Sequence, residues 1–233
     1  MIINERDLRH QSVVEAAHRM MTAARTAPKA KGVDIIEIAL VEAREDLEKL
    51  AEAMRRRSEE TGFKFLLRDA DNILQGEAVI LIGTRRHTQG LNCGYCGYSA
   101  CVQNPAQNPC ALNSIDVGIA IGSACSVAAD LRIDTRVLFS AGWASETLPW
   151  LPGCSQTIAV ALSASSKSPY FDVNRKNKDR QLERWLHALE IHVCSVVSGK
   201  KIGRKSDYIV FRKKEKNEHN VKRDNGKYCK IFI

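Results

Sequence analysis

The sequence predicts an α+β domain, a small sheet flanked by helices, followed by a basic extension. Three long segments repeat apolar residues at helical spacing, and short β-branched runs lie between them. Helices interspersed with short strands indicate a single core. The composition changes abruptly at Asn174. We therefore predict a body of residues 1–173 and an extension of residues 174–233.

The first half of the body is predicted to be helix, strand, helix. Apolar residues recur every three or four positions from about Asp7 to Arg25, which indicates a helix. The run Ile35–Val41 is too short for a buried helix and predicts an interior strand. Glu42–Glu60 is expected to form a charged amphipathic helix, since Gly62 follows it as a typical C-terminal cap.

The second half adds three strands and one long helix. Ala78–Ile82 predicts a second core strand, and 113–131 predicts a helix with Asp116 in its first turn, where the helix dipole favours a carboxylate. Arg136–Ser140 and Thr157–Leu162 are short and apolar, and both are expected to be strands.

The long helix is unusually rich in small residues. Each of Gly118 and Gly122 costs about 1 kcal/mol of helix stability relative to alanine, and Ala120 and Ala124 lie beside them. Close packing of another group against this surface of small residues would offset that cost. We expect either a facing helix, as in a homodimer, or a flat cofactor.

Four cysteines fall within eighteen residues, at Cys93, Cys96, Cys101 and Cys110. The loop 92–111 is broken by glycines and prolines, so its backbone is able to curl around one soft metal centre. Structural zinc usually takes two Cys-x-x-Cys pairs and only one is present, which favours a [4Fe–4S] cluster. Zinc and disulfides remain alternatives.

Gly94 and Gly97 also favour a cluster. Without Cβ atoms they allow backbone amides to approach inorganic sulfides, and such hydrogen bonds help to set the reduction potential. Cys125 and Cys154 are interpreted as buried cysteines that act as small hydrophobic residues. No hydrolase triad, P-loop or dinucleotide fingerprint is present.

Charge and apolar runs bear on location and partners. The N-terminus resembles no signal peptide and no apolar run has membrane-spanning length, so we expect a cytoplasmic protein with reduced thiols and no membrane contact. Residues 1–175 carry 19 basic and 20 acidic residues, whereas residues 176–233 carry 16 and 7. Nucleic acid is therefore an expected partner only for the extension.

Residues 10–173 resemble an uncharacterised family of ferredoxin-domain proteins related to the FMN-dependent nitroreductases. The most specific part is Asn92-Cys-Gly-Tyr-Cys-Gly-Tyr-Ser-Ala-Cys101, which is similar to the four-cysteine [4Fe–4S] module of corrinoid and carbon-monoxide-dehydrogenase partner proteins. Fainter likenesses to nitroreductases lie in 23–41, 116–142 and 151–167. The resemblance implies a nitroreductase-like fold with the cysteine loop inserted, and an iron–sulfur redox function.

The nitroreductase likeness implies FMN as a second cofactor. The Arg-x-Ser-x-Arg motif that anchors the flavin phosphate in that family is missing here. Arg25, Lys29 and Lys167 are the basic residues from which a phosphate site is expected, together with Lys31. Without FMN, the cluster is the only redox centre.

We expect an electron carrier or a flavin-linked oxidoreductase whose partner is a redox protein or a small molecule. The alternative is a zinc-stabilised interaction protein whose basic extension contacts RNA or an acidic partner. In that extension, 181–197 predicts an amphipathic helix, and Tyr208–Phe211 and Tyr228–Ile233 are expected to pair as strands.

Overall fold

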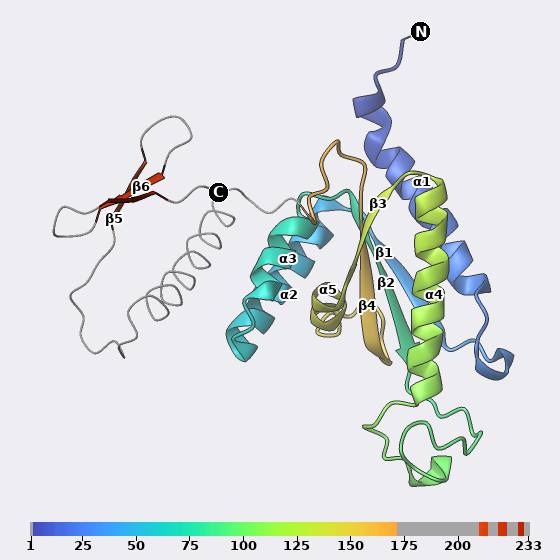
Figure 1. Ribbon diagram of the computed structural model, residues 1–233. Coiled ribbons are helices and arrows are strands. Elements are labelled where there is room, and N and C mark those ends of the chain that lie inside the picture. The colour runs from blue at the N-terminus through green and yellow to red at the C-terminus, as the bar shows by residue number, and fades with distance from the viewer. Residues whose placement is uncertain (1, 172–209, 214–218, 223–227, 231–233) are drawn as a thin grey trace, which may run out of the picture. The chain divides into compact units, whose positions relative to one another are not determined.

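The computed structural model describes residues 2–171, 210–213, 219–222 and 228–230, and the chain separates into two compact units, Met1–Val173 and Asn174–Ile233. In the first unit an antiparallel four-stranded sheet in the order β1-β2-β4-β3 lies between two layers of helices (Figure 1). The strands are β1 (Ile36–Val41), β2 (Ala78–Arg85), β3 (Asp134–Leu138) and β4 (Cys154–Ser163), and the helices are α1 (Glu5–Thr26), α2 (Arg44–Thr61), α3 (Phe65–Ile73), α4 (Ala111–Asp130) and α5 (Phe139–Ser145). This arrangement confirms the predicted α+β class.

The two faces of the sheet carry separate apolar cores. Because side chains alternate along a strand, Val79 and Leu81 of β2 pack with α2, α3 and α5, whereas Ile80 and Ile82 pack with α1 and α4. All four side chains are fully buried, and each such burial contributes about 1.5–3 kcal/mol. The apolar strands therefore fix the positions of both helix layers.

Two short helices differ from the sequence prediction. Helix α3 was not expected, because its nine residues are too few for a periodic pattern to stand out. Helix α5 begins at Phe139, inside the strand predicted over 136–140. Gly142 explains the close packing of α5, since a Cβ atom there would stand 2.2 Å from the carbonyl oxygen of Thr157 on β4.

Strand β2 continues past Gly83, where the prediction ended it, and reaches Arg85. The pairing with β4 shifts register between Ile82 and Thr84. A Cβ atom on Gly83 would lie 2.8 Å from the Thr157 hydroxyl, so glycine lets the two strands stay in contact there. These additional residues of β2 carry the chain to the base of the cysteine loop.

Helix α4 has one buried and one exposed side. Because α4 begins at Ala111, Asp116 lies beyond the first turn in which it was predicted. It is buried, and both of its carboxylate oxygens accept from the Ala30 backbone amide at 3.1 Å, which fixes the α1–β1 connection. On the other side, a Cβ atom on Gly118 or Gly122 would meet nothing within 4 Å, and Ile115 and Ile119 are exposed. The expected facing helix of a second copy stays a prediction.

By length and composition alone, α4 is the one helix among the described residues that is apolar enough to cross a membrane. Its Val117, Ala120 and Ala124 lie in the core formed with α1 and the sheet. Core helices of soluble domains pass the same test, so its composition does not indicate a membrane span.

The described part of the second unit is a three-stranded antiparallel sheet, β5 (Val210–Lys213), β6 (His219–Lys222) and β7 (Tyr228–Lys230), in that order. The prediction paired the first and last of these directly. Instead, both pair with β6. This strand was not predicted, because it lies in a lysine-rich segment that was expected to be a loop. The helix predicted over 181–197 lies outside the described residues.

Candidate metal centre

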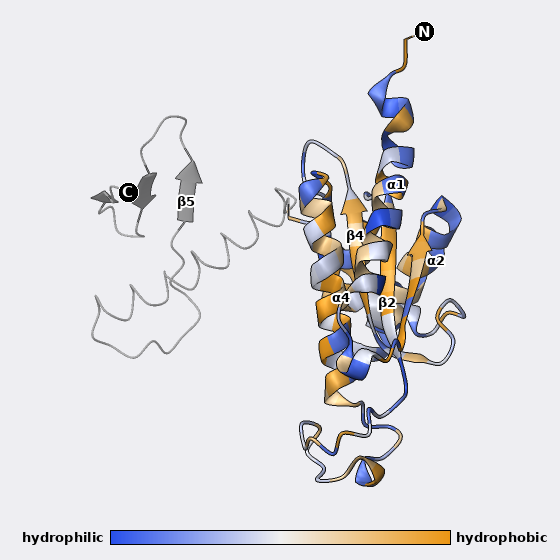
Figure 2. Ribbon diagram, turned by 90° about the vertical axis from the view of Figure 1, so that its right-hand side faces the viewer, coloured by the Kyte–Doolittle hydropathy of each residue, from blue (hydrophilic) through white to orange (hydrophobic). Residues whose placement is uncertain are grey.

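The cysteine loop connects β2 to α4 and extends beyond the end of the sheet (Figure 1). Figure 2 shows it outside the continuous apolar colouring of β2, β4 and α4. No Asp, Glu, Lys or Arg occurs from His87 to Ile115, so the thiols are the principal ionisable groups of the loop. Arg85 and Arg86 stand at its base.

A different local structure positions each cysteine. Cys93 follows Asn92, and Cys96 lies in a turn that the Gly97 amide closes on the Gly94 carbonyl at 2.9 Å. Cys101 begins a short 3₁₀ helix, and Cys110 is the residue that caps α4. Gly94 and Gly97 have φ of 75° and 89°, a conformation that glycine adopts without strain. The loop reverses direction at these glycines.

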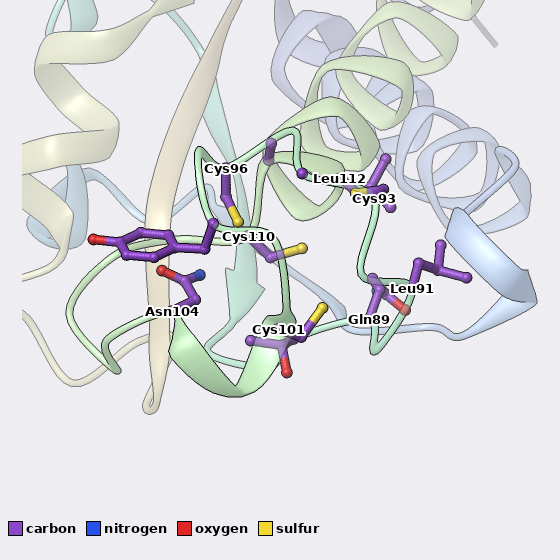
Figure 3. A pocket seen from close by; sticks show the side chains of 12 residues that line it. Gln89, Leu91, Cys93, Cys96, Cys101, Asn104, Cys110 and Leu112 are labelled. Carbon is purple, nitrogen blue, oxygen red and sulfur yellow. The ribbon is translucent and has the colours of Figure 1, made fainter.

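All four predicted cysteines line one pocket, together with Gln89, Tyr98 and Asn104. In Figure 3 the thiols of Cys96, Cys101 and Cys110 point toward the space that the loop encloses, with Cys93 across from Cys96. Within the described ranges, no three His, Cys, Asp or Glu side chains are gathered tightly enough to hold a metal ion as they stand. No carboxylate or imidazole lines this pocket, so its only strong metal donors are thiols, which suit iron–sulfur clusters and zinc.

Asn92 holds Cys101 through two reciprocal hydrogen bonds. The Cys101 amide donates to Asn92 Oδ1 at 2.8 Å, and the Asn92 amide donates to Cys101 Sγ at 3.3 Å. Asn92 adopts φ of 48°, which asparagine tolerates better than most residues. Asn92 therefore orients one thiol.

Three further side chains attach the loop to the body. Lys31 Nζ donates to the Gln89 carbonyl at 2.9 Å, and Gln89 Nε2 donates to Asn113 Oδ1 at 3.0 Å. Asn113 in turn donates to the His87 carbonyl. Gln89 Oε1, buried at the pocket wall, has no hydrogen-bond partner among the described residues. The N-terminal end of the loop is thus fixed to η1 (Ala30–Gly32) and α4.

Cys125 and Cys154 are not part of this pocket. Burial raises the pKa of each thiol above its ordinary value, against a hydrogen bond with Thr135 that lowers the pKa of Cys125. The two thiols are therefore protonated at neutral pH, although each side chain is half-buried and not fully buried as the sequence predicted.

Of the basic residues expected to bind a phosphate, Arg25 and Lys29 lie together near Asp34, whereas Lys167 does not join them. Arg25 pairs with Asp34 at 2.7 Å, and Lys29 Nζ donates to the last carbonyls of α1 at 2.6–2.8 Å. Burial lowers the pKa of Lys29. Lys167 follows the end of β4 at which Leu162 pairs with Ala78, whereas Arg25 donates to the carbonyl of Ile36, which pairs with Thr84. Ala78 and Thr84 lie near opposite ends of β2 and are about 20 Å apart along the extended strand.

Sequence reasoning identified the four thiols but missed the residues that hold them. The position of Asn92 directly before the first cysteine was the only available signal for its role. Lys31 was considered only as a phosphate ligand, yet it anchors the loop. These contacts span between 9 and 58 residues of sequence, so local patterns do not reveal them.

Residues 106–173 match the family described as "Uncharacterized protein containing a ferredoxin domain (DUF2148)". This match includes Cys110 and excludes the first three cysteines of the loop. An uncharacterised protein of Archaeoglobus fulgidus is 41% identical over 182 residues, which cover 74% of this chain and 97% of that protein. The relationship therefore extends over nearly the whole length of that relative.

Among solved structures, the chain is similar to a nitroreductase with bound FMN from Bacteroides fragilis, with 13% identity, a TM-score of 0.48, and coverage of 65% of this chain and 77% of that one. It is also similar to a BluB-like flavoprotein from Clostridium difficile, with 17% identity, a TM-score of 0.46, and coverage of 69% and 82%. A likeness of this strength does not carry a ligand or an activity over to this chain.

Proposed function

Because the chain belongs to the family of uncharacterised proteins that contain a ferredoxin domain, we propose that it is an iron–sulfur redox protein whose one [4Fe–4S] cluster is bound by Cys93, Cys96, Cys101 and Cys110. The observation that carries the proposal is the shared pocket of these four thiols, in which no other strong ligand stands. Such a cluster would supply one-electron transfer.

The surroundings of the pocket suit a negatively charged cluster. Four thiolates would bring negative charge into a loop that has no acidic residue between His87 and Ile115. The Asn92 amide already donates to Cys101 Sγ, and hydrogen bonds to sulfur raise reduction potentials by stabilising the more negative state. Arg85 and Arg86 add positive charge at the loop's base.

The proposal contains no flavin-dependent step. A flavin phosphate requires cations and amide donors that converge on it. Arg25 and Lys29 already bind Asp34 and the end of α1, and Lys167 lies at the other end of the sheet. We therefore assign electron transfer to the cysteine loop alone, in a cytoplasmic setting where its thiols are reduced.

Metal analysis of anaerobically purified protein tests this function. We expect iron and acid-labile sulfide in equal amounts, together with a broad absorbance in the visible blue that dithionite bleaches. One tightly held zinc ion without sulfide would contradict the proposal and support the zinc-stabilised interaction protein. Flavin is measured on the same sample, and bound flavin would contradict the assignment of electron transfer to the cysteine loop alone.

A further inference from the structure

A second, larger hollow adjoins the cysteine pocket. It encloses about 1030 Å³, including its open mouth, between the end of β2, the segment 104–110 and the start of β4. Cys110 lines both this groove and the cysteine pocket. A molecule in the groove would thus lie next to Cys110 and to the pocket that the four thiols line.

The groove is positively charged. Arg85, Arg86 and His87 line it, and no Asp or Glu does. Arg85 is engaged in an ion pair with Glu37. Arg86 is exposed and forms no ion pair or side-chain hydrogen bond with any residue that the structure describes. Its guanidinium is available as a planar fork for a carboxylate or phosphate group.

The polar walls of the groove are already held in place. Asn108 Nδ2 donates to Asn104 Oδ1 at 2.7 Å, and Gln156 Nε2 donates to Ser114 Oγ at 2.8 Å. Asn113, which is buried, donates to the His87 carbonyl. Walls fixed before binding reduce the entropy lost when a ligand is ordered. The groove is therefore preorganised around its one free arginine.

We propose that this groove binds a small organic anion through a carboxylate or phosphate group, with Arg86 as the principal contact. That the anion is a redox substrate rests on the proposed function, since only a loaded cluster would place an electron donor behind Cys110. Binding itself is attributed to the charge and shape of the groove, which no redox step is needed to test.

Calorimetric titration of the anaerobically purified full chain at low ionic strength tests the proposal, with malonate and inorganic phosphate as probes. Malonamide has nearly the shape of malonate without its charge. We expect at least one anion to bind and malonamide not to bind. Arg86→Gln keeps much of the side chain's reach but removes its charge, and should weaken anion binding at least tenfold.

Arg56→Gln is the matched control, because Arg56 is exposed on α2 and lines neither pocket. It should leave binding unchanged. The proposal is wrong if neither anion binds, if malonamide binds as well as malonate, or if both variants behave alike. Iron and sulfide are measured on the same samples. Anion binding without iron would contradict the proposed cluster and support the anion site. Iron with sulfide but without anion binding would support the cluster and contradict the anion site.

Discussion

The six cysteines in the first unit form two groups in very different surroundings. Cys93, Cys96, Cys101 and Cys110 lie in one uncharged loop and line one pocket. Cys125 and Cys154 lie singly in α4 and β4, where burial raises the pKa of their thiols. Cysteine is thus a candidate metal ligand in the loop, where four thiols line one pocket, and a small apolar residue in the body.

The difference follows from how each region is stabilised. The body is stabilised by apolar burial on both faces of the sheet, with Ile80, Leu81 and Ile82 fully buried. The loop instead depends on hydrogen bonds from Asn92 and Lys31, and its Tyr95 and Val102 are exposed. Polar contacts position the thiols, and a bound metal would add the stability that the loop lacks.

Replacing one thiol from each group should give the largest contrast. Cys96→Ser removes a proposed ligand and is expected to abolish nearly all iron, sulfide and visible absorbance, while the far-ultraviolet circular dichroism is retained. Cys125→Ser should keep the full metal content. Iron analysis of anaerobically prepared variants decides, and equal iron in both would remove the distinction between the two groups.

Asn92 tests whether polar contacts position the thiols. Asn92→Ala removes the acceptor of the Cys101 amide, and loss of a group that orients a metal ligand typically costs 10–100-fold in metal affinity. We expect about a tenfold faster loss of iron to a chelator. Asn108→Ala is the control, since it breaks a 2.7 Å hydrogen bond in the same loop without touching a cysteine. Similar rates for both variants would show only general loosening of the loop.

The sequence predicted the body well because its pattern is strong. Residues 78–82 are a continuous apolar run, residues 36–41 are apolar except for Glu37, and the periodicity of α1 and α2 extends over many turns. It failed where tertiary packing overrides local pattern, as in α5, which lies on β4 through Gly142. The short α3 is amphipathic but contains too few turns for a secure prediction.

The site divides in the same way. Cysteine spacing predicted which thiols share a pocket, because soft-metal sites impose that spacing. Spacing says nothing of a groove formed by Arg86, Asn108 and Gln156, which come from three separate segments. The phosphate residues Arg25, Lys29 and Lys167 were chosen for charge, and charge without topology did not predict that Lys167 lies apart from the other two.

Alkylation compares the two groups without any metal. In metal-free reduced protein at pH 8, iodoacetamide should modify exposed Cys93 several-fold faster than Cys125. The thiolate is the reactive form, and burial raises the pKa of Cys125, so less thiolate is present at a given pH and its rate should still be rising above pH 9. Peptide mass spectrometry measures both rates. Equal rates would mean that the body opens as readily as the loop.

The smallest effect is expected from the tether between the two regions. Lys31→Met removes the donor to the Gln89 carbonyl, which lies at a buried residue, and should lower the free energy of unfolding by about 1 kcal/mol. Lys49→Met is the control, since exposed Lys49 pairs with Asp46 at the solvent-facing side of α2 and loss of this pair should not be measurable. Urea denaturation measures stability, and limited proteolysis measures opening of the loop. If Lys31→Met leaves the rate of cleavage after Tyr95 unchanged, the loop is held by its internal contacts and by Asn113, and the attachment to η1 contributes little to the placement of the thiols.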